Sequence, residues 1–230
     1  MLTVRHAQLN FNPGGALYSD EYSDCYYSQA GAIEECRHVF IHGNRLSQRW
    51  QRDSFSIAEL GFGCGINFLT TCAEWLQQTD QSARLHYISF EKHPVQLAQL
   101  KTIYKQIAVD QSLANDLLTQ YPLPVTGVHR LQFADQRITL TLIFGDALSQ
   151  LKECDFCVDA WYLDGFSPSK NPALWSQAIA HEVYRLTTHE GTLATYSVAA
   201  KVKQHFHDAG FKLYKHCLLY TSDAADEEAW

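Results

Sequence analysis

Hydrophobic and polar positions follow two different periods along most of the chain. Short apolar runs rich in β-branched and aromatic residues alternate with longer segments in which apolar residues recur every three or four positions. The short runs predict strands and the longer segments predict amphipathic helices. We expect strands at 56–60, 85–90, 138–144, 156–163 and 191–196, and helices at 66–78, 94–107, 173–186 and 199–209.

This alternation predicts an α/β fold with a doubly wound, largely parallel sheet. The chain has 230 residues, of which 46% are hydrophobic, so it is able to bury a substantial core and is not a disordered chain. A single α/β domain accounts for this length, with two small domains as the alternative.

The two ends of the chain differ from the middle. Short alternating segments at 16–18 and 38–41, with turn signals at 12–15 and 43–44, predict a small β extension over 1–50, ahead of a main domain over 51–220. The last ten residues hold four acids and no base. We therefore expect 221–230 to be a disordered or non-native tail outside the fold.

Several protein classes are excluded by composition. No apolar run reaches the roughly 18 residues of a membrane helix. The amino terminus also lacks the apolar stretch of about 7–15 residues that a secretory signal needs. The seven cysteines are odd in number and scattered, which is typical of reduced thiols. We expect a cytoplasmic protein with no membrane partner.

The sequence predicts no metal site. Cys154 and Cys157 form one CxxC pair, but a zinc ribbon needs a second pair, and this one leads into an expected strand. His38 and His42 share one face of an expected strand without a third ligand, so they are interpreted as packing residues.

Ligands of open α/β sheets bind beyond the carboxyl ends of the strands, so these ends are the places to look for function. Gly61, Gly63 and Gly65 follow the strand at 56–60. Such a turn lets a ligand approach the backbone at a helix start, although a tight turn alone also explains it. The GxGxG spacing differs from the GxGxxG of pyrophosphate sites and favours a ligand without phosphates.

Acidic residues follow the next three expected strands. Glu91 is placed to accept hydrogen bonds from two ribose hydroxyls, the alternative being a solvated side chain. Asp146 suits an adenine amino group, a helix cap, or both. Asp164 precedes Phe166 and a proline-stiffened loop, which together predict a pocket wall, whereas a lone aspartate there would more often be a cap.

These segments resemble a class I S-adenosylmethionine-dependent methyltransferase. The narrower resemblance is to the methyltransferase half of the bifunctional tRNA 5-methylaminomethyl-2-thiouridine biosynthesis enzymes and to their stand-alone relatives. It is carried by residues 24–28, 31–46, 59–69, 88–92, 144–146, 159–175, 191–196 and 209–211. The glycine turn marks any class I methyltransferase, while residues 164–175 are much more specific.

The resemblance implies methyl transfer from S-adenosylmethionine to the exocyclic amine of 5-aminomethyl-(2-thio)uridine at the tRNA wobble position, in the anticodon stem-loop. It implies a cofactor site made by Glu59, Gly61, Gly63, Gly65, Asn67, Glu91 and Asp146. It makes Asp164 the catalytic residue facing the amine. It also implies that the flipped uridine is received by Phe166, Lys170, Asn171 and Pro172.

The chemistry of the amine agrees with that assignment. An alkylammonium has no lone pair and must lose a proton before it attacks a sulfonium methyl group. Asp164 would orient the amine first and act as a base second, because a carboxylate alone favours the charged ammonium.

Two features of the chain depart from this family. Its closing carboxyl-terminal hairpin looks incomplete, and no second glycine-rich βαβ unit is present for the flavin-dependent oxidase half, which would be a separate domain or chain. The net charge of −7 also argues against a tRNA-binding surface. The bases that could form a local patch are Arg37, His38, Arg45, Arg49, Arg52, Lys170, Lys201, Lys203, Lys212 and Lys215.

Two other functions therefore stay open. One is a methyltransferase for a small amine, which an acidic protein would suit. The other is a non-catalytic methyltransferase-like binding domain. The GxGxG spacing disfavours a NAD-dependent oxidoreductase.

Overall fold

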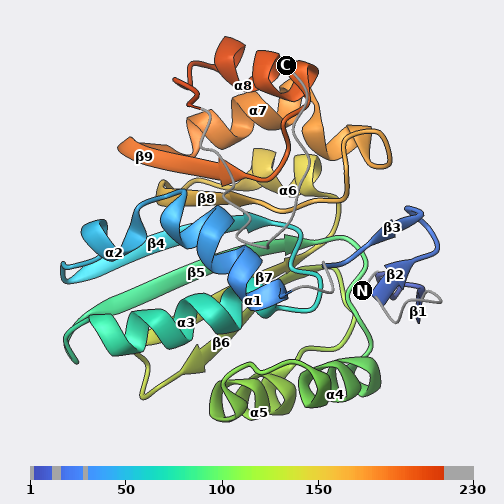
Figure 1. Cartoon of the computed structure of the whole chain (residues 1–230), viewed down its shortest axis with the longest axis vertical. Coiled ribbons are helices and arrows are strands. Elements are labelled where there is room, and N and C mark those ends of the chain that lie inside the picture. Colours follow the sequence, from blue (N-terminus) through green and yellow to red (C-terminus); the bar gives the residue numbers. More distant parts are fainter. Residues whose placement is uncertain (1–2, 12–16, 28–30, 215–230) are drawn as a thin grey trace, which may run out of the picture.

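A six-stranded sheet organises the chain (Figure 1). The computed structural model describes residues 3–11, 17–27 and 31–214. The strand order is β6-β7-β5-β4-β8-β9, and every pair is parallel except β6 with β7. The strands are β4 (Ser54–Leu60), β5 (Arg84–Glu91), β6 (Gly127–Phe133), β7 (Ile138–Phe144), β8 (Val158–Leu163) and β9 (Thr187–Thr195).

Helices cover both faces of this sheet, which confirms the doubly wound, largely parallel fold. Adjacent residues of β4 point to opposite faces, as the period of a strand requires. Ile57 belongs to one apolar core and Ala58 to the other. The helices of the main domain are α3 (Ile66–Gln78), α4 (Leu97–Gln106), α5 (Gln111–Gln120), α6 (Ala147–Glu153), η2 (Pro172–Trp175), α7 (Gln177–Arg185) and α8 (Ala200–Ala209).

The predicted elements differ from the observed ones where capping residues interrupt a pattern. The helix expected at 173–186 is divided into η2 and α7, because the Ser176 hydroxyl accepts from the backbone N–H of Ile179 and starts a new helix. Asp110 caps α5 in the same way, and α5, β6 and α6 were not predicted. The bounds of α3 and β7 match the predicted ranges.

The amino-terminal region is only partly the β extension that was predicted. Three short antiparallel strands are present: β1 (Leu9–Phe11), β2 (Leu17–Ser19) and β3 (Asp24–Cys25). Three helical segments follow, namely α1 (Ala32–Glu35), the π-helix η1 (Cys36–His42) and α2 (Leu46–Arg49).

The strand predicted at 38–41 is therefore wrong. Over a longer window the buried positions are Cys36, Phe40 and Ile41, which is the spacing of one helical face rather than of a strand. His38 and His42 lie on this helix and not on a strand face. The turn at 43–44 is confirmed, whereas the one at 12–15 lies outside the described residues.

The predictions for the carboxyl terminus also fall outside the described residues. Up to residue 214 the main sheet ends at β9, and both the closing hairpin and the tail at 221–230 lie beyond that point. Among the described residues, no helix combines the length and apolar character needed to cross a membrane. The same residues hold no group of three or more histidine, cysteine or acidic side chains arranged to bind a metal.

Candidate active site

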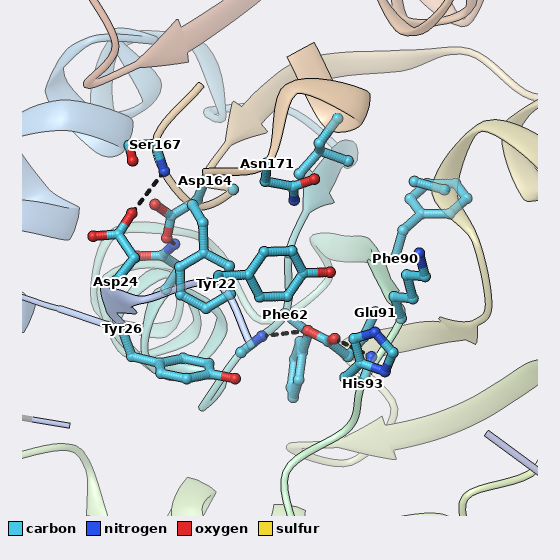
Figure 2. A pocket seen from close by; sticks show the side chains of 18 of the residues that line it. Tyr22, Asp24, Tyr26, Phe62, Phe90, Glu91, His93, Asp164, Ser167 and Asn171 are labelled. Atoms are coloured by element: carbon cyan, nitrogen blue, oxygen red, sulfur yellow. Dashed lines mark hydrogen bonds between the residues drawn. The ribbon is translucent and has the colours of Figure 1, made fainter. Parts of the chain in front are cut away.

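A cavity of about 910 Å³ opens where the carboxyl ends of four parallel strands meet (Figure 2). Leu60, the last residue of β4, pairs with Phe90 on β5 and Leu163 on β8, so these strands end at one level. The cavity wall accordingly combines residues from four strand ends, namely Gly61, Gly63, Glu91, Asp146 and Asp164. The structure thus brings together the groups expected to form one cleft.

The glycine turn supplies a stretch of wall without side chains. Gly61 has a φ of +96°, and a Cβ there would lie 2.5 Å from the backbone oxygen of Asp164. Gly63 has a φ of +52° and lines the same wall. Gly65 is buried behind the turn and does not line the cavity, and a Cβ there would lie 2.8 Å from the ring of Phe62. The turn therefore leaves backbone accessible to a ligand.

Glu91 is fixed by backbone donors at the end of β5. Its Oε2 accepts from the N–H of Gly63 at 2.9 Å, and its Oε1 accepts from the N–H of His93 at 2.6 Å. Burial raises the pKa of Glu91, and these two hydrogen bonds oppose the rise. Because a carboxylate has about four acceptor positions, Glu91 retains capacity for two ligand hydroxyls.

Asp146 caps a helix and lines the cavity. Its Oδ1 accepts from the backbone N–H of Ser149 at 3.1 Å and from the hydroxyl of Ser149 at 3.0 Å, so it caps α6. It also lines the cavity. The capping interpretation is confirmed, and contact with an adenine amino group stays a prediction.

Asp164 is held by a buried amide. Asn67 Nδ2 donates to Asp164 Oδ2 at 2.6 Å and to Glu59 Oε1 at 3.0 Å. Burial raises the pKa of Asp164 to about 7 and that of Glu59 to about 8. Asp164 and Asn67 line the cavity, whereas Glu59 is fully buried and does not. Direct cofactor contact by Glu59 is thus a prediction that this geometry does not support, because its oxygens face Asn67 and Ser89 instead.

Two of the four residues predicted to bind the uridine line the cavity, and both lie on the loop that follows Asp164. Phe166 and Asn171 line the wall. Trp175 holds the loop by donating its indole N–H to the Phe166 carbonyl at 2.7 Å. Lys170 is exposed on the same loop and Pro172 is exposed at the start of η2, and neither lines the cavity.

Residues of the small amino-terminal sheet complete the site and had no predicted role in it. Tyr22 stacks on Phe166 with ring centroids 4.6 Å apart, and Tyr26 meets the same ring edge-on at 5.0 Å. Asp24 accepts from the backbone N–H of Ser167 at 2.9 Å (Figure 2). Only the resemblance of residues 24–28 indicated that this segment belongs with the site, because nothing local joins it to a loop 143 positions away.

The cavity carries more acidic than basic groups. Its lining includes two cationic or titratable bases, Lys92 and His93, and five carboxyl groups, Asp24, Glu35, Glu91, Asp146 and Asp164. Walls of one sign concentrate ligands of the opposite sign. This site therefore suits a ligand with positive charge.

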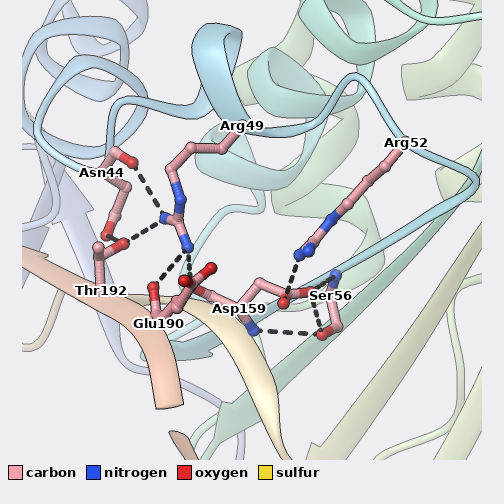
Figure 3. A network of polar contacts seen from close by, with 7 residues as sticks. All are labelled: Asn44, Arg49, Arg52, Ser56, Asp159, Glu190 and Thr192. Carbon is pink, nitrogen blue, oxygen red and sulfur yellow. Dashed lines mark hydrogen bonds and ion pairs between the residues drawn. The ribbon is translucent and has the colours of Figure 1, made fainter. Parts of the chain in front are cut away.

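A second polar network lies near the amino-terminal ends of β4 and β8, away from the cavity (Figure 3). Arg49 donates to the carbonyls of Asn44, Asp159 and Glu190 and to the hydroxyl of Thr192, at 2.6 to 3.1 Å. Burial lowers the pKa of Arg49. These contacts fasten α2 to β8 and β9 and give the network a structural role.

Comparisons with known proteins agree with this site. Residues 109–217 match a family described as S-adenosyl-L-methionine-dependent methyltransferase. The chain is 42% identical over 215 residues to the tRNA 5-methylaminomethyl-2-thiouridine biosynthesis bifunctional protein MnmC of Azoarcus sp., covering 93% of this chain and 34% of that protein. It is 43% identical over 223 residues to the protein of the same name from Aeromonas hydrophila, again covering 93% and 34%.

One solved structure is similar over most of the fold. The crystal structure of MNMC2 from Aquifex aeolicus superposes with a TM-score of 0.72 at 26% identity, covering 90% of this chain and 65% of that chain. The sheet, the glycine turn and the family match together make this chain a class I S-adenosyl-L-methionine-dependent methyltransferase. Within that class it belongs with the methyltransferase domain of the MnmC proteins, and it spans about a third of the length of the curated relatives.

The residues present fit S-adenosylmethionine, the cofactor of this class. Gly61 and Gly63 line the cavity with backbone alone, which lets a ligand approach the glycine turn closely. Glu91 beside them offers acceptors for ribose hydroxyls, and Asp146 offers one for an adenine amine. The carboxylates of the wall suit the positive charge of a sulfonium group.

Proposed function

We propose that this chain transfers a methyl group from S-adenosylmethionine to the exocyclic amine of 5-aminomethyl-(2-thio)uridine at the wobble position of tRNA. The observation that carries the proposal is the position of Asp164. It lies on the wall between the glycine turn and Phe166, in a cavity with an excess of carboxyl groups. The alignment with MnmC proteins covers 93% of this chain, and the name of those proteins supplies the substrate class.

Asp164 has the properties needed to prepare an amine for methylation. S-adenosylmethionine, when bound, supplies an electrophilic methyl group on a sulfonium. The amine must lose a proton first, and a side chain exchanges protons most effectively when its pKa is near the working pH. Burial has raised the pKa of Asp164 to about 7, whereas Asn67 fixes one of its oxygens. Asp164 therefore orients the amine through the other oxygen and accepts its proton.

Phe166 and Tyr22 suit the base that carries this amine. A flipped pyrimidine is held by stacking on aromatic rings in proteins that act on bases. Phe166 follows Asp164 by two positions and already stacks on Tyr22. A uridine that took up this stacking surface would place its 5-substituent near Asp164.

We propose that tRNA binds through basic side chains close to the cavity. Three of the basic residues considered from the sequence already have partners within the chain. Arg37 forms ion pairs with Glu34 and Glu74, and Arg52 forms one with Asp159. Arg49 donates to the Asp159 carbonyl. Lys170 is exposed beside the cavity and Lys92 lines it. We propose that these two lysines contact phosphates that flank the flipped nucleotide. A tRNA substrate also implies a cytoplasmic location.

The full pathway is proposed to need a second activity. The curated relatives are called bifunctional, and this chain spans about a third of their length. We assign the methylation to this chain and an oxidase step, of the flavin-dependent kind, to a separate domain or chain.

The test is methyl transfer from radiolabelled S-adenosylmethionine to tRNA that carries the 5-aminomethyl intermediate. The matched controls are the same tRNA with its amine acetylated, tRNA with unmodified wobble uridine, and the free aminomethyl nucleoside. We expect label only in the aminomethyl tRNA. Equal labelling of the free nucleoside would favour the small-amine methyltransferase. Thermal stabilisation by S-adenosylmethionine without any transfer would favour the non-catalytic domain.

A further inference from the structure

The buried amide of Asn67 connects two carboxyl groups that come from different strands. Its Nδ2 lies 3.0 Å from Glu59 Oε1 and 2.6 Å from Asp164 Oδ2, so each amide hydrogen has its own acceptor. Ser89 is the neighbour of Glu59 on β5 and donates its hydroxyl to Glu59 Oε2 at 2.7 Å. Both oxygens of Glu59 are thus engaged by side chains of neighbouring elements.

The three side chains differ in burial, and therefore in whether they are able to contact a ligand in the cavity. Glu59 has no exposed surface and does not line the cavity. Asn67 has 8% of its surface exposed and, like Asp164, lines the cavity. Glu59 therefore has no direct route to a ligand in the cavity and acts on the site only through Asn67.

We propose that Glu59 is a positioning residue, which holds the Asn67 amide in the orientation that donates to Asp164. The inference rests on the proposed function, in which Asp164 orients and deprotonates the acceptor amine. An amide whose hydrogens have two fixed acceptors is not able to turn without leaving a buried donor unpaired. If the acceptor at Glu59 is removed, this restraint is lost and the hydrogen bond to Asp164 weakens.

Other titratable groups face Asp164 from several elements, and their effects must be kept apart from that of Glu59. They are Glu35 of α1, Cys36 of η1, Glu59 of β4 and Tyr196 after β9. Burial raises the pKa of Glu59 to about 8, above that of Asp164. Both substitutions at Glu59 described below remove its ionisable group, so a difference between them reports on the hydrogen-bond acceptor and not on charge.

Two substitutions at Glu59 differ in the one property that matters. In Glu59→Gln, the amide oxygen still accepts from Asn67 and the amide nitrogen is able to donate to the Ser89 hydroxyl. In Glu59→Met, the side chain keeps a similar length and bulk but has no strong acceptor. A third variant, Asn67→Ala, removes the donor itself and gives the full size of its effect on Asp164, and Glu59→Leu, which also has no acceptor, replaces Glu59→Met if that variant does not fold.

The pKa of Asp164 is the direct readout. It is measured by a carbon-13 NMR titration of the carboxyl carbon in the full chain, with the resonance assigned by its loss in Asp164→Asn. Because Asn67 lowers this pKa by donating to the carboxylate, we expect a rise of about 0.5–1 in Glu59→Met and Asn67→Ala. Glu59→Gln, which keeps the acceptor for Asn67, should titrate at least about 0.5 below Glu59→Met. A folded Glu59→Met that titrates like the wild type would overturn the proposal, as would an equal rise in Glu59→Gln.

Kinetics separate this inference from the proposed function. With aminomethyl tRNA, kcat should fall about tenfold in Glu59→Met, which is the size expected for one hydrogen bond, and stay near wild type in Glu59→Gln. The KM for S-adenosylmethionine should remain within about threefold in both, since Glu59 does not reach the cavity. A wild-type chain that fails to methylate this tRNA refutes the proposed function, whereas the NMR comparison still decides the positioning of Asp164.

Discussion

Replacing Asp164 with asparagine should raise the stability of the fold and lower its activity. The substitution keeps the size of the side chain and the acceptor for Asn67, which donates at 2.6 Å. It removes the ability to ionise and turns the second oxygen into an NH2 donor. Loss of the same buried charge should therefore increase the stability and decrease the turnover.

The change in stability follows from the pKa. Burial raises the pKa of Asp164 from 3.8 to about 7, so the folded state favours the neutral form. A group whose pKa is higher in the folded state stabilises the fold fully below its unfolded pKa, and this contribution is lost as the pH rises towards the folded pKa. The difference corresponds to about 4 kcal/mol at most. Since Asp164 is partly exposed, we expect Asp164→Asn to be about 2–4 kcal/mol more stable at pH 8 and nearly unchanged at pH 4.

Urea unfolding followed by circular dichroism at both pH values measures this difference. Glu153→Gln, which neutralises an exposed carboxylate outside the cavity, is the matched control and should change stability little at either pH. If Asp164→Asn and Glu153→Gln behave alike at pH 8, the reasoning about a buried charge is refuted.

The activity of Asp164→Asn tests the chemical side of the same argument. Turnover on aminomethyl tRNA should fall by about 10²–10⁴-fold if proton acceptance matters, and by less if orientation dominates. Wild-type turnover should also rise as the pH passes about 7, where Asp164 becomes ionised. The affinity for S-adenosylmethionine, measured by calorimetry, should change less than about threefold. Unchanged turnover would remove Asp164 from the mechanism.

Four further substitutions test the other parts of the structure. Gly61→Ala should destabilise the fold by about 2–4 kcal/mol in urea unfolding, because its Cβ would lie 2.5 Å from the Asp164 backbone oxygen; a wild-type midpoint would contradict the turn geometry. Glu91→Gln should weaken S-adenosylmethionine binding about tenfold in calorimetry, since one oxygen that accepts from a backbone N–H becomes a donor, and unaltered affinity would exclude Glu91 from the cofactor site. Arg49→Ala should cost about 2–4 kcal/mol of stability by leaving four acceptors without their donor, with cofactor affinity unchanged, whereas Arg52→Ala should cost less than about 1 kcal/mol.

Local pattern was sufficient to predict five of the six strands of the main sheet and the edge at which the site lies. The apolar runs of β4, β5, β7 and β8 are each followed within two residues by a glycine or an acid. Parallel strands bring their carboxyl ends to one edge, so the order of residues along the chain already implied that Gly61, Glu91, Asp146 and Asp164 would meet. Helix caps at Asp110 and Ser176 were missed because short polar residues favour turns as well as helix starts.

Contacts between distant segments were decided by tertiary structure alone. The run at 38–41 is compatible with a strand when read by itself, and becomes helical because Cys36, Phe40 and Ile41 pack together into the core. The stacking of Tyr22 on Phe166 joins residues separated by more than half of the chain. No periodicity encodes such pairs, since periodicity reports only which face of an element is buried and not what lies against it.

For the carboxyl groups of the site, too, the sequence predicted one part and the tertiary structure decided the other. Their positions at strand ends were readable from the sequence, but their ionisation was not, because a pKa depends on burial and on partners that come from other elements. Asn67 and Glu59 look like unremarkable positions of a helix start and a strand when read singly. Folding places the amide of one between Asp164 and the carboxyl of the other. The sequence therefore determined which groups reach the cavity edge, and the fold determined how each of them is charged and held, because desolvation and hydrogen bonding arise only when the elements pack.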